Sequence, residues 1–110
     1  MNKLVFTFLA LMATVSGVAL AADAAAGKVA FDKSCKGCHG AEGATPNDAV
    51  GKMLGATIPT LSSAEFQASK TDEDIRKAVT EGKGKMPAAL KTAPATTVDD
   101  VIAYVRSIKK

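Results

Sequence analysis

The sequence of 110 residues is poor in aromatic side chains and in the residues that usually bind metals. It has no tryptophan, one tyrosine, one histidine and two cysteines. The cysteines and the histidine together provide only three ligands, which argues against a four-ligand structural zinc site. The net charge of +3 is far below the concentrated positive charge of a nucleic-acid-binding protein. With so few large apolar side chains, the chain would gain stability from a buried cofactor.

The apolar residues of this chain repeat at helical rather than strand spacing. No alternating apolar and polar run is long enough to predict a β-strand, and no repeat or linker marks a second domain. The pattern predicts helices over residues 22–36, 63–69, 71–82 and 97–108, with loops at 40–60 and 83–96. We therefore expect one all-α domain.

Two capping patterns indicate where helices begin. Thr71 is followed by Asp74, and Thr97 by Asp100, which is the spacing of a capping box. We expect one helix to begin beside Thr71 and to stop at Gly82, and the last helix to begin beside Thr97.

The first 21 residues have the features of an export signal. Lys3 precedes an apolar stretch at 4–20, and Ala19-Leu20-Ala21 provides the small residues that a signal peptidase recognises. We expect cleavage after Ala21, a mature domain at 22–110 in the periplasm, and no stable membrane insertion. The alternative is an uncleaved anchor, because the apolar stretch approaches the ~20 residues that span a bilayer.

The five residues Cys35-Lys36-Gly37-Cys38-His39 form the pattern C-x-x-C-H, which indicates covalent attachment of a c-type haem. Two cysteines three positions apart project from the same side of a helical turn, so both sulfurs can reach the vinyl groups of one porphyrin. The imidazole that follows directly is then carried under the iron as its proximal ligand.

An iron with one histidine needs a sixth ligand or leaves that position open. Met86 lies between two glycines and Pro87, and the proline biases it toward an extended backbone on a loop that can cross the ring. Met53 is also in a predicted loop but is better interpreted as an apolar side chain that fills a gap. We therefore predict His39 and Met86 as the iron ligands.

Together these motifs resemble a class I cytochrome c of the small, single-haem bacterial type. The resemblance implies an all-α fold of three to five helices around one covalently bound haem c, with the first and last helices packed crosswise. It also implies that Gly27 and Phe31 of the first helix pack against Tyr104 of the last, where the glycine allows a close crossing.

The same resemblance assigns roles beside the haem. In Ile58-Pro59-Thr60-Leu61, the carbonyl of Pro59 would accept a hydrogen bond from the proximal histidine, and Leu61 would pack on the ring. Relatives often hold the haem propionates with a tryptophan or a loop tyrosine. This chain has no tryptophan and its tyrosine lies in the last helix, so the partners of the propionates stay open.

The function implied is one-electron transfer rather than catalysis, because both axial positions are filled. Partners would be redox proteins such as a terminal oxidase, a dehydrogenase or a cytochrome complex, met by a monomeric carrier. Lys36, Lys83 and Lys85 flank the two haem motifs and could form a basic rim that steers acidic partners, or could be ordinary solvated lysines.

Two other classes stay open. A haem sensor or ligand-binding module would leave the sixth position without Met86. A thiol–disulfide oxidoreductase would use the C-x-x-C pair, but that class expects a βαβ context, which the helical periodicity opposes.

Overall fold

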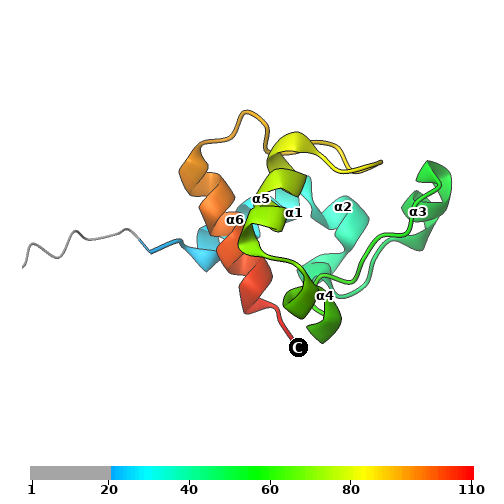
Figure 1. Cartoon of the computed structure of the whole chain (residues 1–110), viewed down its shortest axis with the longest axis horizontal. Helices are drawn as coiled ribbons and strands as arrows, with labels where there is room; N and C mark the ends of the chain where they lie inside the picture. The colour runs from blue at the N-terminus through cyan, green and yellow to red at the C-terminus, as the bar shows by residue number, and fades with distance from the viewer. Residues whose placement is uncertain (1–20) are drawn as a thin grey trace, which may run out of the picture.

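The computed structural model describes residues 21–110 (Figure 1), so nearly all of the predicted export signal lies outside the described residues. The described part is helical and contains no β-strand. No helix within it is long and apolar enough to cross a membrane. In chain order the elements are α1 (Ala24–Ser34), α2 (Lys36–His39), a short 3-10 helix η1 (Ala41–Gly43), α3 (Asp48–Leu54), α4 (Ala64–Ser69), α5 (Asp72–Glu81) and α6 (Ala95–Ser107).

The first and last helices form the central contact of the fold, and they cross each other as predicted (Figure 1). Gly27 makes this crossing possible, because a Cβ atom there would overlap the carbonyl oxygen of Asp100. The rings of Phe31 and Tyr104 pack with their centroids 5.2 Å apart. The predicted contact between these two helices is therefore confirmed.

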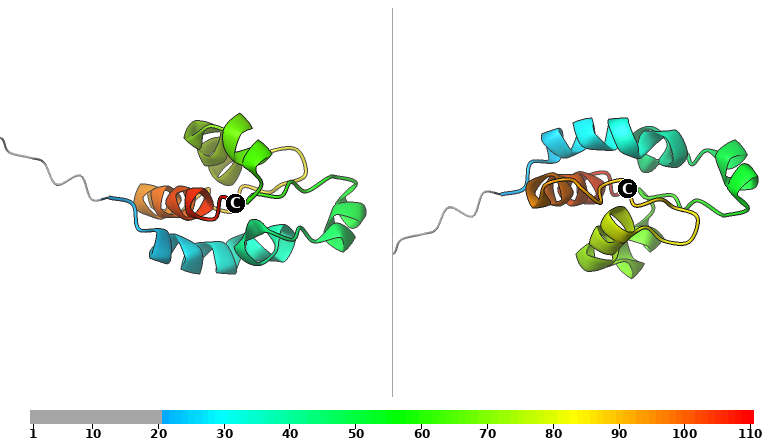
Figure 2. Two further views of the ribbon diagram at one scale, coloured as in Figure 1. Left: turned by 90° about the horizontal axis from the view of Figure 1, so that it is seen from below. Right: turned by 90° about the horizontal axis from the view of Figure 1, so that it is seen from above.

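The buried core spreads from this crossing toward α5. Five of its eleven side chains come from α6, more than from any other element, with Phe31 from α1 and Ile75 and Val79 from α5. Figure 2 shows the layers: α6 lies between α1–α2 on one side and α4–α5 on the other, and α3 stands apart at one end. The core is therefore thickest at α6 and thinner toward the other helices.

Local signals explain where α1 and α5 begin. The Asp23 carboxylate accepts hydrogen bonds from the N–H groups of Ala25 and Ala26, which caps α1 two residues later than the predicted start at 22. In α5 the predicted capping box is present: the Thr71 N–H donates to the Asp74 carboxylate at 2.9 Å, and the Asp74 N–H donates to the Thr71 hydroxyl at 3.1 Å. Both helices thus begin at a capping residue.

The predicted capping box at Thr97 is wrong. The last helix begins at Ala95, directly after Pro94, whose fixed φ suits the entry into a helix. Asp100 is instead used elsewhere, because its carboxylate accepts a hydrogen bond from the N–H of Asp23 at 2.7 Å. The side chain that resembled a cap therefore ties the start of α1 to α6.

The prediction of a continuous loop over 40–60 is also wrong, because α3 lies within it. The Asn47 side chain accepts the N–H of Val50 at 3.3 Å, and Gly55 ends the helix in the left-handed conformation. The predicted first helix is also divided at Cys35, where α1 ends and α2 follows. For these two reasons the described residues form six α-helices rather than three to five, while the all-α fold itself is as predicted.

Candidate haem-binding site

A cavity of about 530 Å³ opens among α1, α2, α5, α6 and the loops that connect them. Its size is within the range of small-molecule and cofactor sites. Every residue that the sequence suggested for the site lies on its lining: Cys35, Cys38, His39, Pro59, Leu61 and Met86. The fold therefore brings together three segments that are far apart in the chain.

The two cysteines lie where α1 ends and α2 begins. The carbonyl of Cys35 accepts the N–H groups of Cys38 at 3.2 Å and of His39 at 3.0 Å, and this turn holds the three side chains at one edge of the cavity. Cys35 is buried, Cys38 is half-buried, and they do not form a disulfide. Both sulfurs are thus presented to whatever fills the cavity.

The chemistry of Cys35 argues against a thiol–disulfide oxidoreductase. Burial, with a smaller contribution from Cys38, raises the pKa of Cys35 to about 11. The attacking cysteine of that enzyme class has a lowered pKa, because the thiolate is the nucleophile. The described residues also contain no βαβ unit, which that class requires.

His39 is buried on the cavity lining, and one of its two ring nitrogens lacks a hydrogen-bond partner. Its Nδ1 atom has no hydrogen-bond partner among the described residues. Burial lowers the pKa of His39, so the imidazole is held in the neutral form that binds metals. The Pro59 backbone opposes this shift, and because proline has no N–H, the group that acts must be its carbonyl. The two groups are close enough to interact, although they do not meet the geometry of a full hydrogen bond.

Met86 is held by a tight turn after α5. The N–H of Lys83 donates to the Met86 carbonyl at 3.0 Å, and the N–H of Met86 donates to the Lys83 carbonyl at 2.9 Å. The turn needs Gly82, whose φ is +79° and whose added Cβ would lie 2.8 Å from the Met86 carbonyl oxygen. Met53, by contrast, is 77% exposed and does not line the cavity.

The sequence did not identify the wall opposite the cysteines as part of the site. Phe66, Ile75 and Val79 line the cavity, and so do Lys70 and Asp74. The spacing of Ile75 and Val79 predicted an inward face of a helix. Nothing in that spacing distinguishes a face packed on protein from a face packed on a cofactor.

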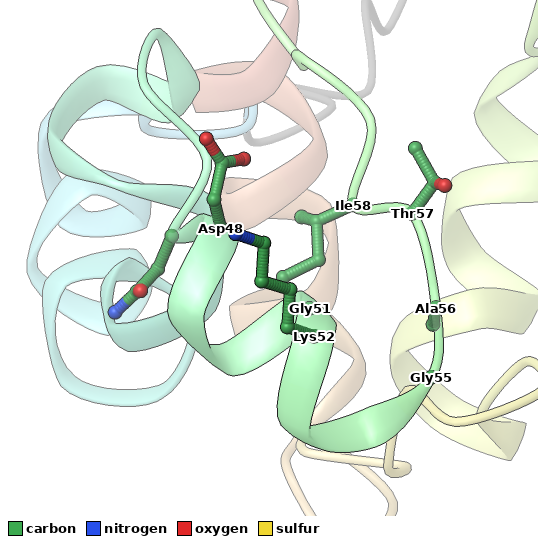
Figure 3. A pocket seen from close by; sticks show the side chains of 8 residues that line it. Asp48, Gly51, Lys52, Gly55, Ala56, Thr57 and Ile58 are labelled. Carbon is green, nitrogen blue, oxygen red and sulfur yellow. The ribbon is translucent and has the colours of Figure 1, made fainter.

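A second cavity of about 390 Å³ lies between α3 and residues 55–58 (Figure 3). It contains no cysteine, histidine or methionine, and its charged lining residues are Asp48 and Lys52. Ala56, Thr57 and Ile58 line both cavities, so this segment is their common wall. Within residues 21–110 no group of three or more His, Cys, Asp and Glu side chains could hold a metal ion, so the zinc interpretation lacks a ligand set.

An all-α fold with the C-x-x-C-H segment at the edge of such a cavity defines a c-type cytochrome. Residues 22–105 match the family model described as "Cytochrome C oxidase, cbb3-type, subunit III", and the chain belongs to this family of c-type cytochrome domains.

Known relatives agree with this assignment. A cytochrome c6 from Rippkaea orientalis is 39% identical over 104 residues, which cover 93% of this chain and 84% of the relative. A cytochrome c6 from a Nostoc species is 35% identical over 92 residues, covering 82% of this chain and 75% of the relative. Among solved structures, the KustC0563 c-type cytochrome matches with a TM-score of 0.62 and 34% identity, over 76% of this chain and 98% of that one.

The prediction of an electron carrier with covalently bound haem c is thereby confirmed. Cys35 and Cys38 are the attachment residues, and the protein transfers electrons rather than acting as an enzyme. The donor set fits the group, because His39 is buried on the lining of the same cavity as both cysteines, and burial lowers the pKa of its imidazole toward the neutral form that binds iron.

Proposed function

We propose that the protein is a periplasmic, monomeric cytochrome c that carries single electrons between redox proteins, with its iron ligated by His39 and Met86. The main support is that His39 and Met86 line the same cavity as the two attachment cysteines. His39 supplies a neutral imidazole, and the Met86 thioether is presented from a loop fixed by two backbone hydrogen bonds.

This ligand pair suits a carrier rather than a sensor. Histidine and methionine together raise the reduction potential of a bound haem iron, and they leave no position for a substrate or gas. Burial in a mainly apolar cavity acts in the same direction, because it disfavours the additional positive charge of ferric iron.

Two residues support the histidine side. The Pro59 carbonyl would accept the Nδ1–H of His39, which fixes the ring orientation and leaves the other nitrogen for iron. Leu61 is buried on the cavity lining and would pack on the face of the ring.

The Met86→Ala variant tests the sixth ligand. We expect loss of the iron–sulfur charge-transfer band in the ferric visible spectrum and a lower reduction potential, because the thioether is removed. The matched control is Met53→Ala, whose side chain is exposed on α3 and should leave both measurements unchanged. A Met86→Ala spectrum that equals that of the unaltered protein would remove Met86 from the site.

Carbon monoxide distinguishes the carrier from a sensor with an open sixth position. The reduced six-coordinate protein should bind the gas poorly, whereas Met86→Ala should bind it readily because the position is vacated. Ready binding by the unaltered protein would favour the sensor.

A single measurement of the protein's mass tests both the cleavage of the export signal and the covalent attachment of haem. We expect the protein recovered from the periplasm to have the mass of residues 22–110 plus one haem, because the signal would be removed after Ala21. A product that retains residues 1–21 on the membrane would support the uncleaved anchor instead.

The proposed partners present acidic surfaces to a basic rim. Lys36, Lys83 and Lys85 are exposed beside the attachment residues and the Met86 turn. Replacing all three by glutamine should slow electron transfer to an acidic partner and flatten its dependence on salt. A rate in the unaltered protein that does not vary with salt would reject steering by this rim.

A further inference from the structure

The propionate carboxylates of the haem need partners in this cavity. An unpaired carboxylate surrounded by apolar side chains is costly, so a cation or a strong hydrogen-bond donor should meet it. In the described part of the chain, no arginine, tyrosine or tryptophan lines the cavity. Its charged lining residues are Lys70, Asp74, Lys83 and Lys85, so a cation for the propionates must come from these lysines.

Attachment through the cysteines limits which wall the propionates can reach. In a haem the propionates and the vinyl groups are carried by opposite halves of the macrocycle. The vinyl half is fixed at Cys35 and Cys38, so the propionates are directed toward walls away from α2. Figure 2 shows α4–α5 on the far side of α6 from α1–α2, and Lys70 connects α4 to α5.

The backbone of Lys70 is held rigidly at this junction. Its N–H donates to the Phe66 carbonyl at 3.0 Å, and its carbonyl accepts Nη2 of Arg106 at 2.6 Å. Arg106 is itself fixed to the Gln67 side chain at 3.0 Å and to the Asp72 carboxylate at 2.8 Å. Lys70 is half-buried on the cavity lining, whereas Lys83 and Lys85 are exposed.

The Lys70 ammonium is also available for a ligand. Among the described residues no carboxylate lies within 4.0 Å of it, in contrast to Lys28, which pairs with Asp32 at 2.8 Å. The nearby Asp74 carboxylate is already used in the cap of α5, where it accepts the Thr71 N–H. Lys70 therefore combines a fixed backbone and partial burial with a charge that forms no ion pair within 4.0 Å, although it contributes to the lowered pKa of the more distant Asp74 carboxylate.

We propose that Lys70 binds a haem propionate and takes the place of the aromatic donors that this chain lacks. The inference rests on the covalent attachment of the haem at Cys35 and Cys38, not on Met86 as the sixth ligand. Its failure can therefore be distinguished from a failure of the proposed iron ligation.

The test is a pH titration of the propionates in protein that contains ¹³C-labelled haem. In Lys70→Gln we expect the pKa of one propionate to rise by about 1–3, because the opposite charge is lost. The reduction potential should acquire a matching dependence on pH that the unaltered protein lacks over the same range. The other charged groups around Lys70, namely Asp72, Asp74, Lys83 and Arg106, are kept in the variant and contribute equally to both proteins.

Three further variants make the result decisive. Lys70→Arg should restore the low propionate pKa, because it restores the charge at the same backbone position. Lys77→Gln removes an exposed α5 lysine that does not line the cavity and should change neither measurement. A Lys70→Gln titration equal to that of the unaltered protein would overturn the inference, and so would a Lys83→Gln variant that alone raises the propionate pKa. The iron–sulfur band, recorded on each sample, reports the Met86 ligation separately.

Discussion

The α1–α6 crossing and the wall formed by α4 and α5 are built in different ways. At the crossing, protein packs on protein: Tyr104 is 5% exposed without lining the cavity, its ring lies 5.2 Å from that of Phe31, and Gly27 lets the two backbones touch. On the other wall, α4 contributes no buried residue, and the two buried side chains of α5 face the cavity. One region is completed by the chain itself, and the other is completed by the haem.

The difference suggests that the haem has a structural role as well as a functional one. Residues 22–110 are only slightly more than the ~70–80 residues below which a domain usually needs a covalent or metal staple. Two thioether bonds at the α1–α2 junction would attach that staple next to the region that is already well packed. The haem would then supply the apolar surface against which α4 and α5 pack, because the chain itself does not provide one.

The largest effect should come from removing the attachment residues. In Cys35→Ala/Cys38→Ala we expect no covalent haem and loss of a cooperative thermal transition, because the α4–α5 wall has no partner. Circular dichroism and denaturing electrophoresis with haem staining measure these outcomes. Ser34→Ala, at an exposed neighbour, is the control. A double variant that still unfolds cooperatively near the normal temperature would show that the two regions do not differ in this way.

The next effect tests the crossing itself. Gly27→Ala places a methyl group against the Asp100 carbonyl, so α1 and α6 must move apart, at a cost of about 1–3 kcal/mol in the free energy of unfolding. Gly37→Ala is the matched control, because a Cβ there meets no atom within 4 Å. The haem spectrum should change little in Gly27→Ala, since Gly27 does not line the cavity. Equal stability of the two variants would contradict the close approach.

A third test concerns the turn that places Met86 at the cavity. Gly82 and Gly84 both have positive φ, so alanine at either should cost about 1–2 kcal/mol. Only at Gly82 would the new Cβ also meet the Met86 carbonyl oxygen, at 2.8 Å. Gly82→Ala should therefore weaken the iron–sulfur band as well as the stability, while Gly84→Ala should affect stability alone. Identical spectra in the two variants would contradict the role of Gly82 in placing Met86.

The two regions also differ in how far the sequence could predict them. The start of α5 followed from Thr71 and Asp74, because a capping box is a local signal. The same spacing at Thr97 gave a wrong prediction. The last helix already begins after Pro94, and the Asp100 carboxylate accepts a hydrogen bond from the N–H of Asp23 instead. Local patterns are therefore informative only where no distant segment competes for the same side chain.

The residues of the site also differ in whether local sequence could identify them. The C-x-x-C-H segment was identifiable because all its chemistry lies in consecutive residues. The position of Lys70 was not, because Arg106, far along the chain, fixes its carbonyl. Likewise α3 was missed, since Pro46 and Gly51 hid a helix that Asn47 and Gly55 cap.

The smallest expected effect concerns the cap that opens α5. Hydrogen bonds from the Thr71 backbone and side chain lower the pKa of Asp74 below its ordinary value of 3.8. A carboxylate with a lowered folded pKa stabilises the protein above its unfolded pKa, and this contribution is lost as the pH falls through the folded value. The unaltered protein should therefore melt slightly above Asp74→Asn at neutral pH and lose that advantage in acid. Glu81→Gln, at the C-terminal end of α5, should show no such advantage, because a carboxylate there opposes the helix dipole. An advantage over Asp74→Asn that persists in acid would show that the cap does not depend on the charge of Asp74.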